Sequence, residues 1–202
     1  NITIVGEGTV TEKIISSPSG REYPHGSIIE LTATPKAGWI FSNYVIDGKS
    51  IGEKITKIEV LKQLAEELKS LALDSDFLYR IEGQNNWFTP EFVLLSIHSI
   101  TENYLDEKAL RNWLENYPIV EKDHVAIILA GNIPLVGFHD ILCAYFAASR
   151  VSIKLSSKDN LLTKAVLDIW CKIDSAWAER IQIIERIEIC DKIIATGSNT
   201  SY

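Results

Sequence analysis

The stretch HVAIILAGNIPLVGFHDILCAYFAASRVSIKL, residues 124–155, decides the fold. It opens on a continuous apolar run, His124 to Ala130, which is typical of a strand covered on both faces. Residues 134–148 carry apolar side chains at helical spacing, and residues 151–155 form a second apolar run. The stretch therefore predicts a strand, a helix and a second strand in succession.

The same alternation continues toward the end of the chain. Asp159 is a suitable N-cap for a helix over residues 160–173, and short strands are expected at residues 181–184 and 192–196. Strands that alternate with helices predict an α/β domain with a parallel sheet and right-handed crossovers. In such a sheet, the loops after the strands meet at the carboxyl edge, where ligands bind.

Three polar loops are expected at that edge, namely residues 131–134, 154–158 and 196–199. Each loop leads toward a possible helix N-terminus, where free backbone N–H groups and the helix dipole favour anions such as a diphosphate. The topology therefore predicts a dinucleotide crevice.

The first part of the chain has a different pattern. In residues 1–52, β-branched and polar residues alternate between closely spaced Gly and Pro residues, which predicts a small all-β module. Residues 53–202 begin with a helical lead-in: residues 55–73 are apolar at helical spacing, Thr89 and Pro90 open a second helix, and residues 106–117 form a third. We therefore expect two domains.

Composition narrows the classes of function. The 202 residues are 46% hydrophobic and 23% charged, which is an ordinary globular composition that excludes a membrane-spanning protein. The net charge of -7 offers no electrostatic footprint for a nucleic acid or an anionic membrane. Cys143, Cys171 and Cys190 have no paired spacing, and the histidines have no ligand spacing, so we expect no disulfide, no metal site and a reducing, cytoplasmic location.

Four motifs carry a resemblance to a known family. They are NWFTP at residues 86–90, AGNIPLVGFHD at 130–140, KLSSKD at 154–159 and ATGSN at 195–199. With them, residues 54–202 resemble the amino-terminal part of the LuxC-type fatty acyl-CoA reductases, which belong to the aldehyde dehydrogenase superfamily. The resemblance implies a partial aldehyde-dehydrogenase-like, Rossmann-type parallel sheet. It also implies an NADPH-dependent enzyme that reduces long-chain acyl thioesters of CoA or a carrier protein to fatty aldehydes through an acyl-cysteine, as a homo-oligomer when full-length.

The resemblance also assigns roles to residues of the three loops. Asn132 stands where the superfamily has an Asn that donates to the carbonyl oxygen under attack, so its implied role is catalytic, as an oxyanion donor. Lys154 matches the Lys that touches the adenosine ribose. Ser156, Ser157 and Lys158 follow it, with Ser157 where the superfamily commonly has a Glu. A hydroxyl and an ammonium group can donate hydrogen bonds to a 2′-phosphate, whereas a carboxylate would repel it. These residues therefore favour NADPH over NADH.

The resemblance also implies a role for the last loop and a position for the nucleophile. Gly197 and Ser198 match the Gly-Ser that opens a helix under the cofactor's diphosphate or nicotinamide half, where Gly permits close backbone approach. Thr196, just before them, is a further candidate for cofactor binding. In the family the nucleophilic Cys follows downstream of this loop, and none of the three Cys present matches it. We therefore expect the chain to be a fragment with no reductase turnover of its own.

Residues 1–52 resemble the divergent internalin-type β-repeat of bacterial surface proteins, through stretches such as LTATPKAGWIF at residues 31–41. This resemblance keeps an alternative open, a noncatalytic surface or interaction protein. A second alternative is an aldehyde dehydrogenase that acts in the oxidative direction.

Simpler interpretations of the site residues also exist. Asn132 suits the cap of a helix that begins near Pro134, and Lys154 and Lys158 suit solvated charges beside a strand end. Cys143 suits a buried structural thiol, and His139 with Asp140 suits a local hydrogen-bonded pair at a helix start.

Overall fold

The structure is a computed structural model that describes residues 7–16, 28–36, 45–46, 49–50, 52–117 and 122–196. The chain divides into two compact units, Asn1–Glu53 and Lys54–Tyr202. Among the described residues, no helix has the length and apolar character needed to cross a membrane.

The described part of the first unit consists of antiparallel strand pairs. Strand β1 (Gly8–Ser16) pairs with β2 (Ile28–Pro35), and β3 (Val45–Ile46) pairs with β4 (Lys49–Ser50). The exposed ammonium group of Lys36 lies 3.1 Å from the Glu7 carboxylate, next to the open end of the β1–β2 pair. Surface ion pairs of this kind contribute little to stability, so the strand pairing itself holds this sheet together.

The second unit begins with a helical layer. Its elements are α1 (Gly52–Leu71), α2 (Ser75–Gln84), α3 (Pro90–Ser99), the π-helical turn η1 (Ile100–Tyr104) and α4 (Glu107–Glu115). The side chains of Asp74, Thr89 and Asp106 cap α2, α3 and α4 by accepting from backbone N–H groups of the first turn. The predicted start of a helix at Thr89 and Pro90 is confirmed, because both signals are local to the chain.

A four-stranded parallel sheet follows the helical layer. It contains β5 (Asp123–Ile128), β6 (Ala148–Lys154), β7 (Ile181–Ile183) and β8 (Lys192–Ala195), in the order β7-β6-β5-β8. Helix α5 (Phe138–Ala147) connects β5 to β6, and α6 (Asn160–Ile173) and α7 (Ser175–Arg180) connect β6 to β7. The predicted mixed α/β class with a parallel sheet is therefore confirmed.

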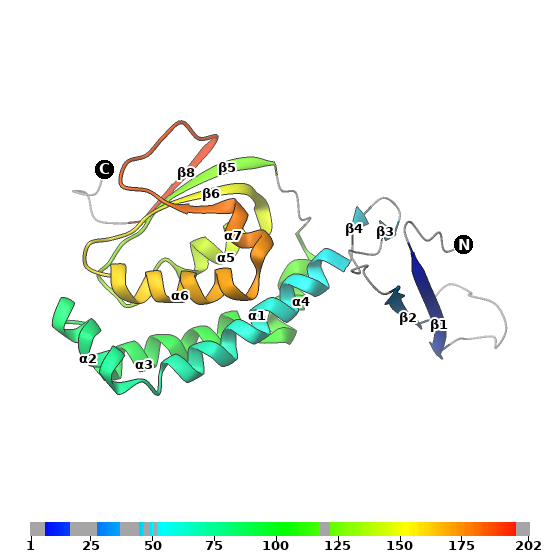
Figure 1. Cartoon of the computed structure of the whole chain (residues 1–202), viewed down its shortest axis with the longest axis horizontal. Coiled ribbons are helices and arrows are strands. Elements are labelled where there is room, and N and C mark those ends of the chain that lie inside the picture. Colours follow the sequence, from blue (N-terminus) through cyan, green and yellow to red (C-terminus); the bar gives the residue numbers. More distant parts are fainter. Residues whose placement is uncertain are drawn as a thin grey trace. The chain divides into compact units, whose positions relative to one another are not determined.

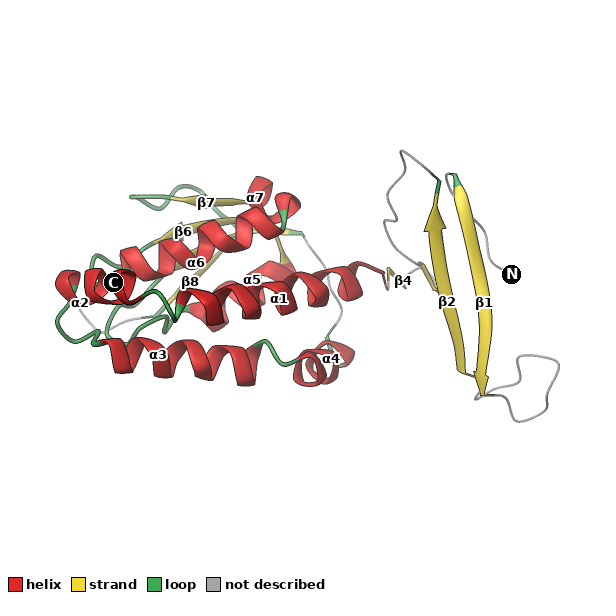
Figure 2. Cartoon of the chain, turned by 60° about the horizontal axis from the view of Figure 1, so that its bottom comes forward, coloured by secondary structure: helices red, strands yellow, loops and turns green. Residues whose placement is uncertain are grey.

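The core lies between the sheet and the helices. Figure 1 shows α5 and α6 on the same side of the sheet as α1 and α3, and Figure 2 shows α1 running between α6 and α3. Val151 and Ile153 of β6 are fully buried, and so are Trp170 of α6 and Trp177 of α7. The two indole rings lie 5.6 Å apart and pack on Tyr145, which ties the helices together.

Helix α5 begins later than predicted. Residues 134–137 form a turn, and the first helical residue is Phe138 rather than Pro134. In this turn Leu135 has a left-handed φ of 56°. A left-handed residue cannot continue a right-handed helix, which explains why the apolar spacing in this segment was misleading.

Candidate functional site

The carboxyl ends of β5, β6 and β8 lie side by side. Ile128 at the end of β5 is in register with Lys154 on β6 and with Ala195 on β8. Just beyond the strands, the Leu129 N–H donates to the Lys154 carbonyl oxygen at 3.0 Å, and the Thr196 N–H donates to the Ile128 carbonyl oxygen at 3.2 Å. The loops that begin with residues 129, 155 and 196 therefore leave from one edge.

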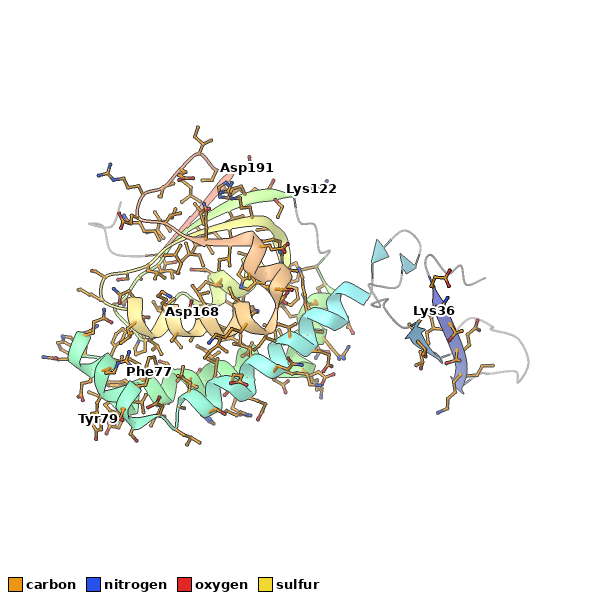
Figure 3. The ribbon with its side chains drawn as sticks, in the orientation of Figure 1. Lys36, Phe77, Tyr79, Lys122, Asp168 and Asp191 are labelled. Atoms are coloured by element: carbon orange, nitrogen blue, oxygen red, sulfur yellow. The ribbon has the colours of Figure 1, made fainter. Side chains whose placement is uncertain are left out.

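The strand order reverses at this edge. The chain passes from β5 outward through β6 to β7, and then returns to place β8 on the opposite side of β5. In open α/β sheets the crevice at such a reversal is where ligands bind. Figure 3 labels Lys122 and Asp191, which immediately precede β5 and β8 and so mark the opposite, amino edge.

Asn132 is exposed in the loop after β5, and its side chain has no hydrogen-bond partner among the described residues. The N-cap of α5 is Gly137, and no side chain caps this helix. The interpretation of Asn132 as a helix cap is therefore wrong. Its amide group is available to a ligand at the edge.

The first two loops interlock at Gly131. A Cβ atom at this position would lie 2.2 Å from the Ser156 hydroxyl oxygen and 2.7 Å from the Ser156 Cβ. Only glycine fits at such a close approach. Ser156 is half-buried, and its hydroxyl oxygen also accepts from the Lys158 N–H at 3.3 Å, so this predicted cofactor residue faces the neighbouring loop.

Asp159, just before α6, connects the loop after β6 to the loop after β5. Its carboxylate is buried and accepts from the Leu135 N–H at 2.8 Å, although it occupies the N-cap position of α6. Burial raises the pKa of Asp159 to about 6, an effect that the Leu135 hydrogen bond opposes. The predicted position of Asp159 at the helix start is confirmed, but its side chain holds the Asn132 loop instead of capping α6.

Thr196 and Asp140 connect the third loop to α5. The Thr196 hydroxyl donates to the Asp140 carboxylate at 2.9 Å. His139 contacts a different partner, Cys143, whose sulfur lies 3.8 Å from the imidazole nitrogens. The predicted local pair of His139 with Asp140 is therefore wrong, because successive helical residues point in different directions.

The remaining predicted residues have two different outcomes. Lys154, Ser157 and Lys158 are exposed, and within the described part of the chain neither ammonium group has an ion-pair partner. Gly197 and Ser198 lie outside the described residues. The edge therefore presents an exposed amide, a hydroxyl and two ammonium groups, which are donors suited to an anionic or oxygen-rich ligand.

The start of α6 is partly occupied by the protein itself. The Leu161 N–H donates to Gln84 at 3.3 Å, and the Gln84 amide also contacts Asn160. The Asn85 amide donates to the Lys158 carbonyl oxygen at 3.1 Å. The end of α2 thus satisfies one of the free N–H groups of α6, so this helix start is less open to a diphosphate than the sequence predicts.

Three residues that organise the edge were not predicted from the sequence to belong to the site: Gly131, Asp140 and Asp159. Only Gly131 carried a signal, because a glycine just after an apolar strand often marks a close backbone approach. Among the described residues, no group of three or more His, Cys, Asp or Glu side chains is arranged to hold a metal ion.

No protein-family model matches this chain, and no match is found among curated proteins or among solved structures. The assignment of function therefore depends on the residues and their geometry.

Proposed function

We propose that residues 54–202 are the amino-terminal part of a LuxC-type acyl-CoA reductase, with a Rossmann-type sheet that binds NADPH at its carboxyl edge. The observation that carries this proposal is the position of Ile128, which is paired with both Lys154 and Ala195. Because of this pairing, three polar loops leave from the edge where the strand order reverses. A nucleotide that lies across the edge would meet Asn132, residues 154–158 and Thr196.

The exposed side chains of the second loop suit a nucleotide with a 2′-phosphate. Lys154 and Lys158 supply positive charge, and Ser157 supplies a hydroxyl group. The nearest carboxylate in sequence, that of Asp159, is turned inward to Leu135 and so does not oppose a phosphate at the surface. This donor set fits NADPH better than NADH.

Asn132 is the proposed oxyanion donor. Bound NADPH would supply the hydride for reduction of the acyl group. As an acyl carbonyl becomes tetrahedral, charge develops on its oxygen, and the amide N–H of Asn132 would donate to that oxygen. One such donor stabilises the transition state by about 3 kcal/mol.

Cys143 and Cys171 do not provide the nucleophile in this proposal. Burial raises the pKa of the Cys143 thiol, with a smaller contribution from Asp140, and burial also raises the pKa of Cys171. A raised pKa keeps a thiol protonated, whereas attack on a thioester needs the thiolate. The acylated cysteine belongs downstream of the ATGSN loop, as the resemblance implies.

Titration of the full chain with NADPH and with NADH, followed by tryptophan fluorescence or calorimetry, tests the proposal. We expect saturable binding that is tighter for NADPH. The variant Lys154→Ala should weaken NADPH binding about tenfold, because a charge-assisted hydrogen bond is lost. Lys108→Ala, which removes an exposed ammonium group on α4, is the matched control and should bind as the wild type does.

Absence of saturable binding would contradict the proposal and favour the noncatalytic alternative. Equal weakening by both Lys variants would show a general charge effect instead of a ribose contact. Equal affinity for NADH and NADPH would show that Ser157 and Lys158 do not recognise the 2′-phosphate.

A further inference from the structure

A cavity lies between α4 and α5, and none of the residues proposed to bind NADPH lines it. Its volume is about 390 Å³. We call it the α4–α5 pocket. Its main lining residues are Trp113, Tyr117, His139, Cys143, Phe146 and Ala147.

Helical spacing builds this pocket. His139, Cys143, Phe146 and Ala147 recur at three and four residues and therefore share one face of α5. Asp140, one residue after His139, points instead to Thr196 at the sheet edge. The α4–α5 pocket and the sheet edge are thus reached from different faces of the same helix.

The walls of the pocket are aromatic. The ring of Trp113 meets that of Phe146 edge-on, with centroids 5.8 Å apart, and lies 6.3 Å from the His139 ring. On its other side, His139 lies 5.4 Å from the ring of Tyr104. These contacts hold the rings in place, so the cavity is preformed, as ligand pockets usually are.

Four lining residues carry a polar group, namely Trp113, Tyr117, His139 and Cys143. The Cys143 sulfur lies 3.8 Å from the His139 ring nitrogens, and burial raises the pKa of this thiol. None of the lining residues is Lys, Arg, Asp or Glu. A charged ligand would lose its hydration here, and the only lining group that could pair with an anion is the His139 ring.

We propose that the α4–α5 pocket binds a neutral aliphatic molecule with one hydroxyl or carbonyl group. Its chain would lie against Trp113 and Phe146, and its polar group would lie toward His139 and Cys143. The volume leaves room for such a molecule, because a cavity of about 150 Å³ already holds benzene and ligand pockets start at about 300 Å³. Neither NADPH nor Asn132 enters this site, so binding here would stand even if the proposed cofactor site failed.

Protection of Cys143 from alkylation tests the proposal in the full chain. The chain is treated with N-ethylmaleimide with and without n-decanol, and each cysteine is followed by peptide mass spectrometry. At an n-decanol concentration about ten times its Kd, we expect Cys143 to react about tenfold more slowly. Cys171 and Cys190 serve as internal controls and should react at unchanged rates. Decanoate, which has the same chain length but carries a charge, should protect Cys143 more weakly, because its carboxylate loses hydration and finds only the His139 ring as a partner.

Two substitutions and a series of alcohols of different chain length test the proposal further. Ala147→Trp should fill the pocket and abolish protection, whereas Ala178→Trp, at an exposed alanine of α7, should leave it intact. In the wild type, n-hexanol, n-octanol and n-decanol should bind progressively more tightly, by about fourfold for each methylene.

Several outcomes would overturn the proposal. These are an unchanged Cys143 rate with n-decanol, equal slowing of all three cysteines, equal protection by decanoate, or an affinity that does not depend on chain length. The chain-length series needs no substitution, so it remains decisive if Ala147→Trp does not fold.

Discussion

The carboxylate of Asp159 accepts a hydrogen bond from the backbone N–H of Leu135 at 2.8 Å, and Leu135 is held at a φ of 56°. A left-handed conformation costs an L-residue about 1–2 kcal/mol. The hydrogen bond that the Leu135 N–H donates to this buried carboxylate helps to offset that cost. Asp159 therefore fixes the turn between Asn132 and α5, although it lies 24 residues further along the chain.

The first prediction concerns the pH dependence of stability. Burial raises the pKa of Asp159 to about 6 from the usual 3.8. Between these values the folded state binds more protons than the unfolded state, so the free energy of unfolding contributed by Asp159 falls as the pH rises from about 4 to 6. The fall amounts to roughly 3 kcal/mol. Asp159→Asn keeps an acceptor for Leu135 but cannot ionise, and should remove this fall in urea unfolding measured across that range.

Asp168→Asn is the control for this series. Asp168 is exposed on α6, and its carboxylate lies 2.7 Å from the Lys164 ammonium group. Its substitution should leave the pH profile between 4 and 6 unchanged. Identical profiles for the wild type and Asp159→Asn would show that Asp159 ionises normally.

The second prediction concerns the contact between the first two loops. Gly131→Ala should destabilise the chain by about 1–3 kcal/mol, because the new Cβ would overlap Ser156. The double variant Gly131→Ala with Ser156→Gly should recover part of this loss, since the overlapping atoms are gone. Thermal or urea unfolding measures both.

Gly83→Ala provides the matched control, since a Cβ at Gly83 on α2 would meet nothing within 4 Å. It should stabilise the chain by about 0.5–1 kcal/mol, because alanine is the better helix former. A neutral Gly131→Ala variant would mean that the two loops do not interlock.

The third prediction separates a catalytic role of Asn132 from a structural one. Because its exposed side chain has no partner among the described residues, Asn132→Ala should leave the unfolding temperature and the Kd for NADPH unchanged. In a longer protein that contains the nucleophile, it should lower kcat about a hundredfold or more. Loss of stability, or unchanged turnover, would remove the oxyanion assignment.

The fourth prediction concerns the link between β8 and α5. Thr196→Val preserves shape but removes the hydroxyl that donates to Asp140, which should cost about 1 kcal/mol in unfolding free energy. In the background of Asp140→Ala the same substitution should cost almost nothing. Additive effects in this double-mutant cycle would show that the two side chains do not interact.

Sequence reasoning located the elements better than it located the contacts between them. The helix start at Thr89 and Pro90 was predictable because a cap and a proline act on adjacent residues. The start of α5 was not, because Leu135 has a left-handed backbone and its N–H donates to the distant carboxylate of Asp159. The same holds for the candidate site. Its polar loops were predicted from the sequence, but the contact between two of them at Gly131 was not.

The sequence by itself determined the alternation of apolar runs and helical stripes, and hence the α/β class and the parallel sheet, since hydrophobic spacing records which faces are buried. Only the tertiary structure decided that Cys143 is half-buried beside a cavity instead of being a buried structural thiol, and that Asp159 turns inward. It also decided which residues stand next to Ile128. Contacts between distant segments depend on register and side-chain direction, and spacing along one chain does not encode either of them.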